Sequence, residues 1–373
     1  MGPDAHREIP EFERILVRAA NWLGDAIMSL PALEAIRRRF PRAWICVLAR
    51  PWVADLYESE PFADEVIRLT AGRGAGDPGG KWRAARALRS RRFDGAILLQ
   101  NAFEAALITW LARIPRRIGY ARDGRGFLLT DPVPPPAAGE LPRHERFYYL
   151  EMLRRAGIIE GPLHPGPVLL RRAPELRERG GAALRRSGLP APVLGVSPGA
   201  AFGGAKRWPA DRFGEAAARL AERLGASVAV FGSAAERTLC EHAATIVRGR
   251  GVAVRNFAGE TPLGAFVELA AGCALYLTND SGAMHVASAL AVPTLAVFGP
   301  TDENGTGPLG DRSAVVRETV DCSPCLLREC PLDHRCMLRV TVERVVEAAL
   351  RLTVETGQTG PSPRTTVSGS SAP

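Results

Sequence analysis

The sequence predicts an α/β protein made of two Rossmann-like, doubly wound domains that face each other across a cleft. Short apolar runs alternate with helical patterns, the alternation breaks at a segment rich in Pro and Gly, and it then begins again. Strands that alternate with helices form βαβ units and a parallel sheet. We expect domains at residues 1–170 and 171–352. The polar tail at 353–373 has few apolar residues, and we expect it to be disordered.

In the first half, the apolar runs are short enough to be buried strands, and the segments between them carry helical periodicity. We expect strands at 15–19, 44–48, 65–69 and 95–99, and helices at 26–40, 52–59, 81–91 and 104–113. The pattern breaks at 131–136 and again at 161–167. In the second half we expect strands at 193–196, 227–231, 274–277 and 294–298, and helices at 209–224, 235–247, 262–272 and 281–290.

Composition narrows the class of protein. The 373 residues are 46% hydrophobic and 24% charged, which is typical of a globular protein. The polar N-terminus predicts no signal peptide, and no apolar run reaches the length of about 18 residues that a membrane span needs. The net charge of +8 suits anionic substrates or a membrane surface. Because no nucleic-acid-binding motif is present, we expect no nucleic-acid partner.

The most informative motif is Thr278-Asn279-Asp280-Ser281-Gly282-Ala283-Met284-His285, which follows an apolar run and opens a helical pattern. A strand that turns at once into a helix presents free N–H groups and a positive dipole end, which suits a phosphate. Gly282 permits close approach, and Asp280 or Ser281 can cap the helix. The alternative is an ordinary capped turn with a histidine in the core.

A second motif begins with Ser197-Pro198-Gly199-Ala200 and continues with Lys206-Arg207-Trp208-Pro209. It follows the first strand of the second half, at the sheet edge where ligands bind in doubly wound domains. Both motifs then lie at one edge and predict a diphosphate site that needs no metal. The absence of an Asp-x-Asp motif favours this interpretation, although cations before a helix are often only a solvated edge.

The third group is Arg18, Asn21, Gly24 and Asp25, directly after the first strand. We expect Asp25 to begin the helix at 26–40. A carboxylate at that position stays ionised in the field of the helix and can accept a proton from a hydroxyl group. The alternative is a simple helix N-cap, worth about 1 kcal/mol.

With these motifs in place, the chain resembles the glycosyltransferase family 9 heptosyltransferases, and within them the heptosyltransferase II branch. The resemblance covers about residues 14–350. It rests on the order and spacing of five segments, which are Asn21-Trp22-Leu23-Gly24-Asp25, Pro198-Gly199-Ala200 with Ala205-Lys206-Arg207-Trp208-Pro209, Thr278-Asn279-Asp280-Ser281-Gly282 with His285, Phe298-Gly299-Pro300-Thr301, and Cys322-Ser323-Pro324-Cys325 with Cys330-Pro331 and His334-Arg335-Cys336.

The resemblance implies a GT-B fold and inverting transfer of L-glycero-D-manno-heptose from ADP-heptose to the inner-core heptose of lipopolysaccharide. The N-terminal domain would hold the acceptor, and Asp25 would be the general base. The donor would contact Ser197, Gly199, Lys206, Glu236, Asp280, Ser281, Gly282 and His285 in the C-terminal domain. Acceptor contacts would come from Arg18, Asn21, Arg143 and His144.

The same resemblance implies that no cofactor is needed and that a monomer works in the cytoplasm, peripheral to the inner membrane, on an anionic lipid acceptor. Three alternatives remain open. The chain can be a family 9 enzyme of the heptosyltransferase I or III type, a sugar-nucleotide epimerase of similar fold, or a nucleotide-binding module without activity.

The cysteines divide into two groups. Cys46, Cys240 and Cys273 lie in strand or helix patterns and are expected in the core. Four others, Cys322, Cys325, Cys330 and Cys336, have a spacing that can hold a structural zinc ion. We favour reduced thiols in a packed loop, because Cys-x2-Cys without a second well-spaced pair is only suggestive.

Overall fold

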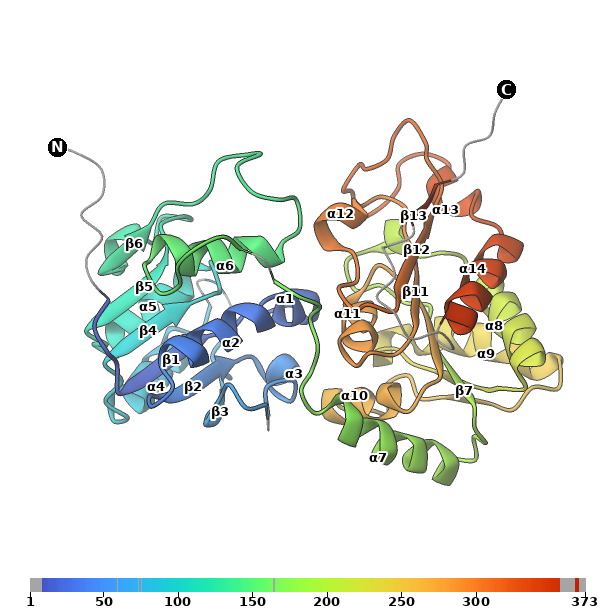
Figure 1. Ribbon diagram of the computed structural model, residues 1–373, viewed down its shortest axis with the longest axis horizontal. Helices are drawn as coiled ribbons and strands as arrows, with labels where there is room; N and C mark the ends of the chain where they lie inside the picture. The colour runs from blue at the N-terminus through green and yellow to red at the C-terminus, as the bar shows by residue number, and fades with distance from the viewer. Residues whose placement is uncertain are drawn as a thin grey trace. The chain divides into compact units, whose positions relative to one another are not determined.

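The computed structural model describes residues 9–58, 60–72, 74, 76–163, 165–355 and 366–368. The chain forms two compact units, residues 1–166 and 167–373 (Figure 1). The division falls inside the second break of the sequence pattern. Each unit contains one parallel sheet, so the predicted α/β class with two doubly wound domains is confirmed.

The N-terminal unit is built on a six-stranded sheet with the order β3-β2-β1-β4-β5-β6. Its strands are β1 (Arg14–Arg18), β2 (Trp44–Ala49), β3 (Glu65–Arg68), β4 (Gly95–Leu98), β5 (Arg116–Tyr120) and β6 (Asp131–Val133). Its helices are α1 (Leu23–Met28), α2 (Leu30–Arg39), α3 (Pro51–Ala54), α4 (Pro78–Arg89), α5 (Phe103–Leu111), η1 (Gly126–Leu128) and α6 (Arg146–Arg155).

The C-terminal unit has a seven-stranded parallel sheet with the order β13-β12-β11-β10-β7-β8-β9. Its strands are β7 (Val193–Ser197), β8 (Ser227–Val230), β9 (Val254–Asn256), β10 (Leu275–Asn279), β11 (Thr294–Val297), β12 (Ser313–Arg317) and β13 (Thr366–Ser368). Its helices are α7 (Ala173–Arg186), η2 (Gly204–Lys206), α8 (Ala210–Leu224), η3 (Ala234–Glu236), α9 (Arg237–Gly249), α10 (Leu263–Ala271), α11 (Gly282–Ala289), α12 (Glu303–Thr306), α13 (Arg335–Leu338) and α14 (Val342–Glu355).

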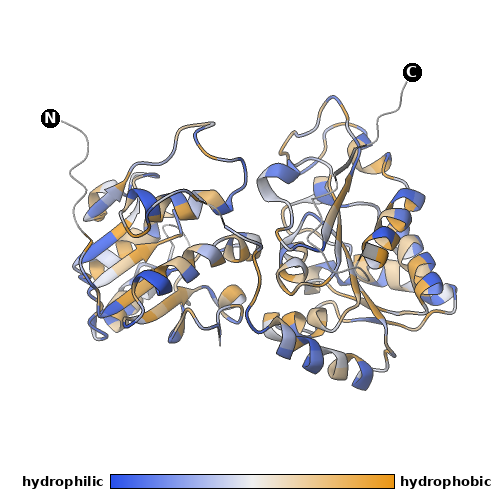
Figure 2. Cartoon of the chain, in the orientation of Figure 1, coloured by the Kyte–Doolittle hydropathy of each residue, from blue (hydrophilic) through white to orange (hydrophobic). Residues whose placement is uncertain are grey.

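Helices cover both faces of each sheet. In the N-terminal unit α4 packs beside α5, and α2 packs beside α6 on the other face (Figure 1). In the C-terminal unit α8 lies between α9 and α14, whereas α10 contacts both α7 and α11. Helices α8 and α14 carry both hydrophilic and hydrophobic residues around their circumference, which Figure 2 shows as alternating colours. Burial of the apolar stripe against the sheet is what holds such helices in place.

Both sheets reverse their strand order at one point, and the functional motifs follow the strands at that point. The reversal lies between β1 and β4 in the first sheet and between β7 and β10 in the second. Loops after the carboxyl ends of these strands diverge, which leaves room for a ligand between them. The fold therefore brings Ser197–Trp208 next to Thr278–His285, although 70 or more residues separate their starts.

The prediction of a single helix at 26–40 is wrong. Two helices, α1 and α2, meet at Ser29, whose hydroxyl donates to the carbonyl of Ala26. Pro31 has no N–H to continue the first ladder, but it fits the first turn of a new helix. Asp25 consequently lies inside α1, three residues after the N-cap position of Trp22, rather than before the helix.

Several elements had too weak a pattern to be predicted. These are β5, β6, α6, α7, β9, β12, α12, α13 and α14. The segment 353–373, expected to be a disordered tail, begins with the last residues of α14, and β13 within it pairs with β12. Its other residues lie outside the described part of the chain.

Helices α7 and α10 approach so closely that only glycine fits at their contact. A Cβ atom on Gly180 would lie 1.9 Å from the carbonyl oxygen of Glu268, and one on Gly272 would meet the backbone of Gly180 and Gly181 at 2.4 Å. Backbone atoms cannot move aside as a flexible side chain can. The contact therefore requires glycine at both positions.

We expect Gly180→Ala to lower the free energy of unfolding by about 1–3 kcal/mol, because the added methyl group forces the two helices apart. Gly181→Ala is the matched control, since its Cβ would meet only the end of the Arg185 side chain at 3.7 Å. Better helix propensity should make that variant equal to the parent or more stable by up to about 1 kcal/mol. Urea denaturation measures both. Equal stability of the two variants would contradict the close approach.

Candidate functional site

The side chain of Asn279, at the end of β10, joins the two loops that carry the C-terminal motifs. Its Nδ2 donates to the carbonyls of Pro198 and Gly199 at 2.7 and 3.4 Å, and its Oδ1 accepts from the N–H of Trp208 at 2.9 Å. Asn279 is fully buried. One amide therefore fixes both ends of the loop that contains Lys206.

Lys206 and Asp280 form a buried ion pair. The Lys206 Nζ lies 2.6 Å from Asp280 Oδ2, and the side chains are 12% and 4% exposed. Thr301, in the loop after β11, donates its hydroxyl to the same Asp280 oxygen at 2.6 Å. Lys206 also lies over the ring of Phe202, 4.7 Å from its centroid. The positive charge expected from Lys206 is thus compensated by Asp280.

Helix α11 begins directly after this pair. Ser281 is its N-cap residue, but neither it nor Asp280 caps the helix through its side chain. The Ser281 hydroxyl lies 3.2 Å from that of Thr278, and the Asp280 carboxylate binds Lys206 and Thr301. In the described part of the chain, no side chain caps the first N–H groups of the helix, and such groups can bind an acceptor from outside the chain. His285 is buried on the same helix.

Glu236 lies against the loop after β7, although the sequence placed it there only loosely. A Cβ atom on Gly199 would come within 2.2 Å of Glu236 Oε1, so any larger residue at position 199 would displace this carboxylate. The other oxygen of Glu236 accepts from the backbone N–H and the hydroxyl of Ser233 at 2.9 and 2.8 Å. This capping box holds the carboxylate at the loop.

Ser197 differs from the other predicted donor residues. It is buried, and its hydroxyl lies 2.7 Å from that of Tyr276 on the neighbouring strand. Burial raises the pKa of Tyr276 well above its ordinary value, so the phenol stays protonated. The Ser197 hydroxyl is therefore used within the sheet, and its contact with the donor stays a prediction.

The cysteine-rich segment packs against the loop of Lys206. The N–H groups of Gly204 and Ala205 donate to Glu329 Oε1 and to the carbonyl of Arg328, both at 2.9 Å. The ring Nε2 of His334 lies 2.8 Å from the carbonyl of Ala205. These three contacts hold η2 against the cysteine-rich segment. Sequence reasoning gave Arg328 and Glu329 no role.

Cys322, Cys325, Cys330 and Cys336 are not in disulfides. Cys336 is buried in α13, and burial together with the three neighbouring thiols raises the pKa of its own thiol. In the part of the chain that the structure describes, no three His, Cys, Asp or Glu side chains are grouped so that they could hold a metal ion. The structural zinc ion stays an untested alternative.

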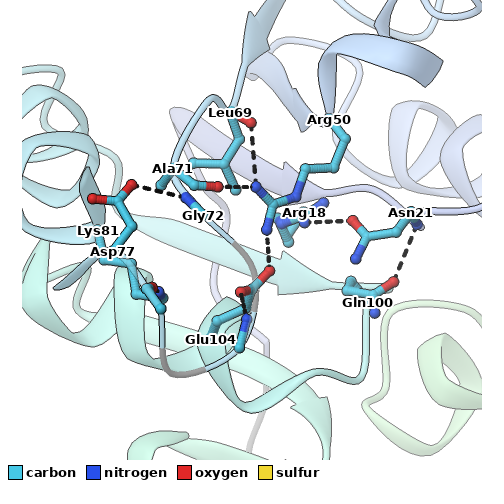
Figure 3. Close-up of polar contacts among 12 residues, drawn as sticks. Arg18, Asn21, Arg50, Leu69, Ala71, Gly72, Asp77, Lys81, Gln100 and Glu104 are labelled. Atoms are coloured by element: carbon cyan, nitrogen blue, oxygen red, sulfur yellow. Dashed lines mark hydrogen bonds and ion pairs between the residues drawn. The ribbon is translucent and has the colours of Figure 1, made fainter.

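In the N-terminal unit, Arg18 positions Asn21 (Figure 3). Arg18 is fully buried, and its NH2 group donates to Asn21 Oδ1 at 2.6 Å. The backbone N–H of Asn21 donates to Gln100 Oε1 at 3.2 Å, which ties the loop after β1 to the loop after β4. Burial, and then the nearby Arg50, lowers the pKa of Arg18 to about 10. Arg18 supports the side chain of Asn21, and its contact with the acceptor stays a prediction.

A second buried arginine, Arg50, is paired with Glu104 at the start of α5 (Figure 3). The other oxygen of Glu104 accepts from the N–H of Gly74 at 2.9 Å. Beside this pair lies a cavity of about 540 Å³, lined by Asn21, Trp22, Gly74, Pro78, Lys81, Ala102, Phe103, Glu104, Leu107 and Leu111. Lys81 is buried, and its ammonium group donates to the carbonyl of Gly76.

Asp25 is half-buried in the first turn of α1. It lies close to the buried phenol of Tyr149 on α6. The pKa of Tyr149 is well above its ordinary value, first because of burial and second because the Asp25 carboxylate opposes a second negative charge. Asp25 is thus a carboxylate beside a phenol that remains protonated.

Arg143 and His144 lie near the start of α6. His144 is buried, and its Nδ1 accepts from the N–H of Arg146 at 3.2 Å. This contact orders the turn that leads into the helix. Arg143 is exposed just before it. The structure therefore leaves Arg143 as the more accessible member of the pair predicted to meet the acceptor.

A family model described as glycosyltransferase family 9 (heptosyltransferase) matches residues 81–335, more than half of the chain. The chain belongs to glycosyltransferase family 9. Its similarity to lipopolysaccharide heptosyltransferase 2 of Salmonella typhimurium is 34% identity over 353 residues, which is 92% of this chain and 99% of the relative. The enzyme of the same name from Escherichia coli is also 34% identical and covers 90% and 97% of the two chains.

Solved structures of the family agree. The E. coli ADP-heptose lps heptosyltransferase II superposes with a TM-score of 0.77 at 30% identity, covering 92% of this chain and 100% of that one. A family 9 glycosyl transferase from Veillonella parvula has a TM-score of 0.79 at 24% identity, over 94% and 100%, and shows the same fold. Within the described residues, no helix has the length and apolarity to cross a membrane.

The geometry places two residues of this family 9 enzyme in roles that its motifs only hinted at. Thr301 ends the motif Phe298-Gly299-Pro300-Thr301, but nothing in the sequence shows that its hydroxyl donates to Asp280. Trp208 also belongs to one of the predicted motifs. It is fully buried, and its ring N–H donates to the carbonyl of Val340 at 3.0 Å. Both contacts join segments far apart in the chain, so no local pattern could reveal them.

We expect Asn279→Ala to lower the free energy of unfolding by about 2–4 kcal/mol, since it removes three hydrogen bonds and leaves the buried N–H of Trp208 without its acceptor. Asn304→Ala is the control. The exposed amide of Asn304 donates to Asp302 at 3.0 Å, and its loss should cost less than about 1 kcal/mol. Denaturant titration of both variants measures the difference. A stable Asn279→Ala protein would show that the loops hold without the amide.

Proposed function

We propose that this family 9 enzyme transfers heptose from ADP-heptose to the inner-core heptose of lipopolysaccharide, with inversion at the anomeric carbon. The similarity to heptosyltransferase 2 proteins over nearly the whole of both chains supports this donor and acceptor. The observation that carries the proposal is the site formed by Lys206, Asp280 and the start of α11. It combines a cation with open helix N–H groups, as a diphosphate requires.

In this mechanism the C-terminal unit holds the donor. The diphosphate accepts hydrogen bonds from the N–H groups at Ser281 and Gly282. The ammonium group of Lys206 interacts with the negative charge of the diphosphate. When the bond from the anomeric carbon to the phosphate oxygen breaks, its electron pair stays on ADP. Cation and helix field stabilise that added charge most strongly once the bond has broken. Asp280 and His285 position the sugar, and Glu236 lies where the nucleoside would reach the Gly199 loop.

The N-terminal unit holds the acceptor and the base. Asp25 takes the proton of the acceptor hydroxyl while the oxygen forms its bond to the anomeric carbon. Asn21 precedes α1, the helix that contains Asp25, and its amide is oriented by Arg18. Arg143 and His144 are candidates for contacts with acceptor phosphates. This chemistry needs no cofactor, and the enzyme works as a monomer on the cytoplasmic surface of the inner membrane.

We expect Asp25→Asn to reduce turnover by at least about a hundredfold, the usual minimum for losing a general base. The affinity for ADP-heptose should hardly change, because the donor residues belong to the other unit. Asp123→Asn is the control, since Asp123 is an exposed carboxylate whose left-handed backbone suits asparagine equally well. Release of ADP in the presence of acceptor measures turnover. Near-normal turnover in a folded Asp25→Asn protein would leave Asp25 a structural residue of α1.

We expect Lys206→Met to weaken ADP-heptose binding and to reduce turnover by a larger factor. Methionine keeps the contact with Phe202 but removes the charge, whose effect is greater when the leaving group carries its full charge. Arg223→Met, which removes an exposed cation at the end of α8, should change neither quantity. Calorimetry and steady-state kinetics separate the two effects. A larger loss in binding than in turnover would contradict the role in the transition state.

The same mechanism predicts full activity in EDTA, because Lys206 and the helix field take the place of a divalent cation. Activity that disappears in EDTA and returns with Mg²⁺ would refute the metal-free mechanism. Unfolding in EDTA, followed by circular dichroism, would instead identify the four-cysteine segment as a structural metal site.

A further inference from the structure

Helices α4 and α5 of the N-terminal unit have an unusual outer surface. Between them they contain one acidic residue, Glu104, and it is buried against Arg50. The outward side of α4 instead carries Arg83, Arg86 and Arg89, all exposed. Within the residues described, no ion pair forms at Arg86 or Arg89, and Arg83 reaches Asp77 only at 3.9 Å. The surface is therefore strongly positive.

The same surface exposes large apolar side chains. Trp82 on α4 is 57% exposed, and Trp110 on α5 is 47% exposed. Phe103, Leu107 and Trp110 follow at helical spacing along the outer side of α5. Phe127 of η1, 76% exposed, extends this row through a ring contact with Phe103 at 6.2 Å. A row of this kind is costly to leave in water and marks an interaction surface.

We propose that the outer surface of α4, α5 and η1 seats the N-terminal unit on an anionic lipid bilayer. We call it the α4–α5 face, defined by Trp82, Arg86, Arg89, Phe103, Trp110 and Phe127. Arginines meet lipid phosphates, and tryptophan rings settle at the level of the headgroups, where one edge is apolar and the other wet. The proposal rests on the proposed function, because that function places the acceptor in such a membrane.

Charge decides between a bilayer and another occupant. A second copy of this chain carries a net charge of +8, so it is repelled by a cationic face, whereas an anionic membrane is attracted. The two tryptophans lie on neighbouring helices and the arginines on the same outer side of α4. Apolar anchors and cations are thus mixed in one layer, as a headgroup region requires.

The α4–α5 face also borders the cavity described above. Phe103 belongs to the face and to the cavity wall, and Leu107 and Leu111 continue that wall along α5. Asn21 and Lys81 line the same cavity and offer polar groups. An acceptor whose lipid remains in the bilayer can therefore extend its sugar portion from the face toward Asn21.

The test is flotation of the full-length protein with phosphatidylcholine vesicles, with and without phosphatidylglycerol. We expect binding only to the anionic vesicles. Arg86→Gln with Arg89→Gln should weaken it by at least about tenfold, since each cation near an anionic surface contributes roughly a factor of five. Trp82→Ser with Trp110→Ser should also weaken it. Matched controls are Arg38→Gln with Arg42→Gln, and Trp44→Ser, which change exposed residues at α2 and the start of β2.

Activity separates this proposal from the proposed function. ADP release with an acceptor embedded in anionic vesicles should fall in the face variants, and ADP release with a deacylated acceptor in solution should not. Lack of activity of the parent protein on the deacylated acceptor would refute the proposed function and leave the flotation result intact. Thermal melting verifies that every variant is folded.

Three outcomes would overturn the proposal. Face variants that float like the parent, or control variants that lose binding equally, would show that the α4–α5 face has no special part. Face variants that change the molar mass in light scattering, with flotation unchanged, would assign the face to contacts between copies of the chain.

Discussion

The amide of Asn279 is the contact on which the C-terminal site depends. It stands at the end of the strand next to β7, at the point where the strand order of the sheet reverses. Loops diverge there, so backbone hydrogen bonds of the sheet no longer connect them. A buried amide has both donors and an acceptor, and Asn279 uses them on Pro198, Gly199 and Trp208. The reversal creates the space for a ligand, and the hydrogen bonds of Asn279 fix the loop that borders this space.

Compensated charge is the second constraint. Lys206 would be expensive to bury alone, and Asp280 with Thr301 removes that cost. The arrangement also keeps the ammonium group at one place before a ligand arrives, so little reorganisation is needed when a diphosphate binds. In the N-terminal unit, Arg50 and Glu104 are paired in the same way, while Arg18 bonds neutral acceptors and bears a lowered pKa. Both units thus place buried cations behind their loops.

The supports of the site differ in how far they were visible in the sequence. Motif residues such as Asp25, Lys206 and Asp280 were predicted because a strand followed by a helix has a recognisable pattern, and the loop between them is short. The sequence did not predict the contacts of Glu329, Thr301 and Tyr276, because each of these residues bonds to a residue more than twenty positions away. Ser197 shows the opposite case, because the sequence predicted a donor contact for it, whereas the structure uses its hydroxyl inside the sheet. Local pattern locates a loop, whereas contact partners depend on the packing of distant segments.

The sequence by itself determined the α/β class, the two doubly wound domains and the loops that carry the site, because apolar periodicity and turn residues are local properties. The sequence also contains Pro31, and a proline at this position indicates that a new helix begins there. Only the tertiary structure decided that Lys206 is paired with Asp280, that Arg18 acts through Asn21, and that α4 and α5 share one basic and aromatic surface. Each of these results from strand order and helix packing, which bring together side chains that no local pattern relates.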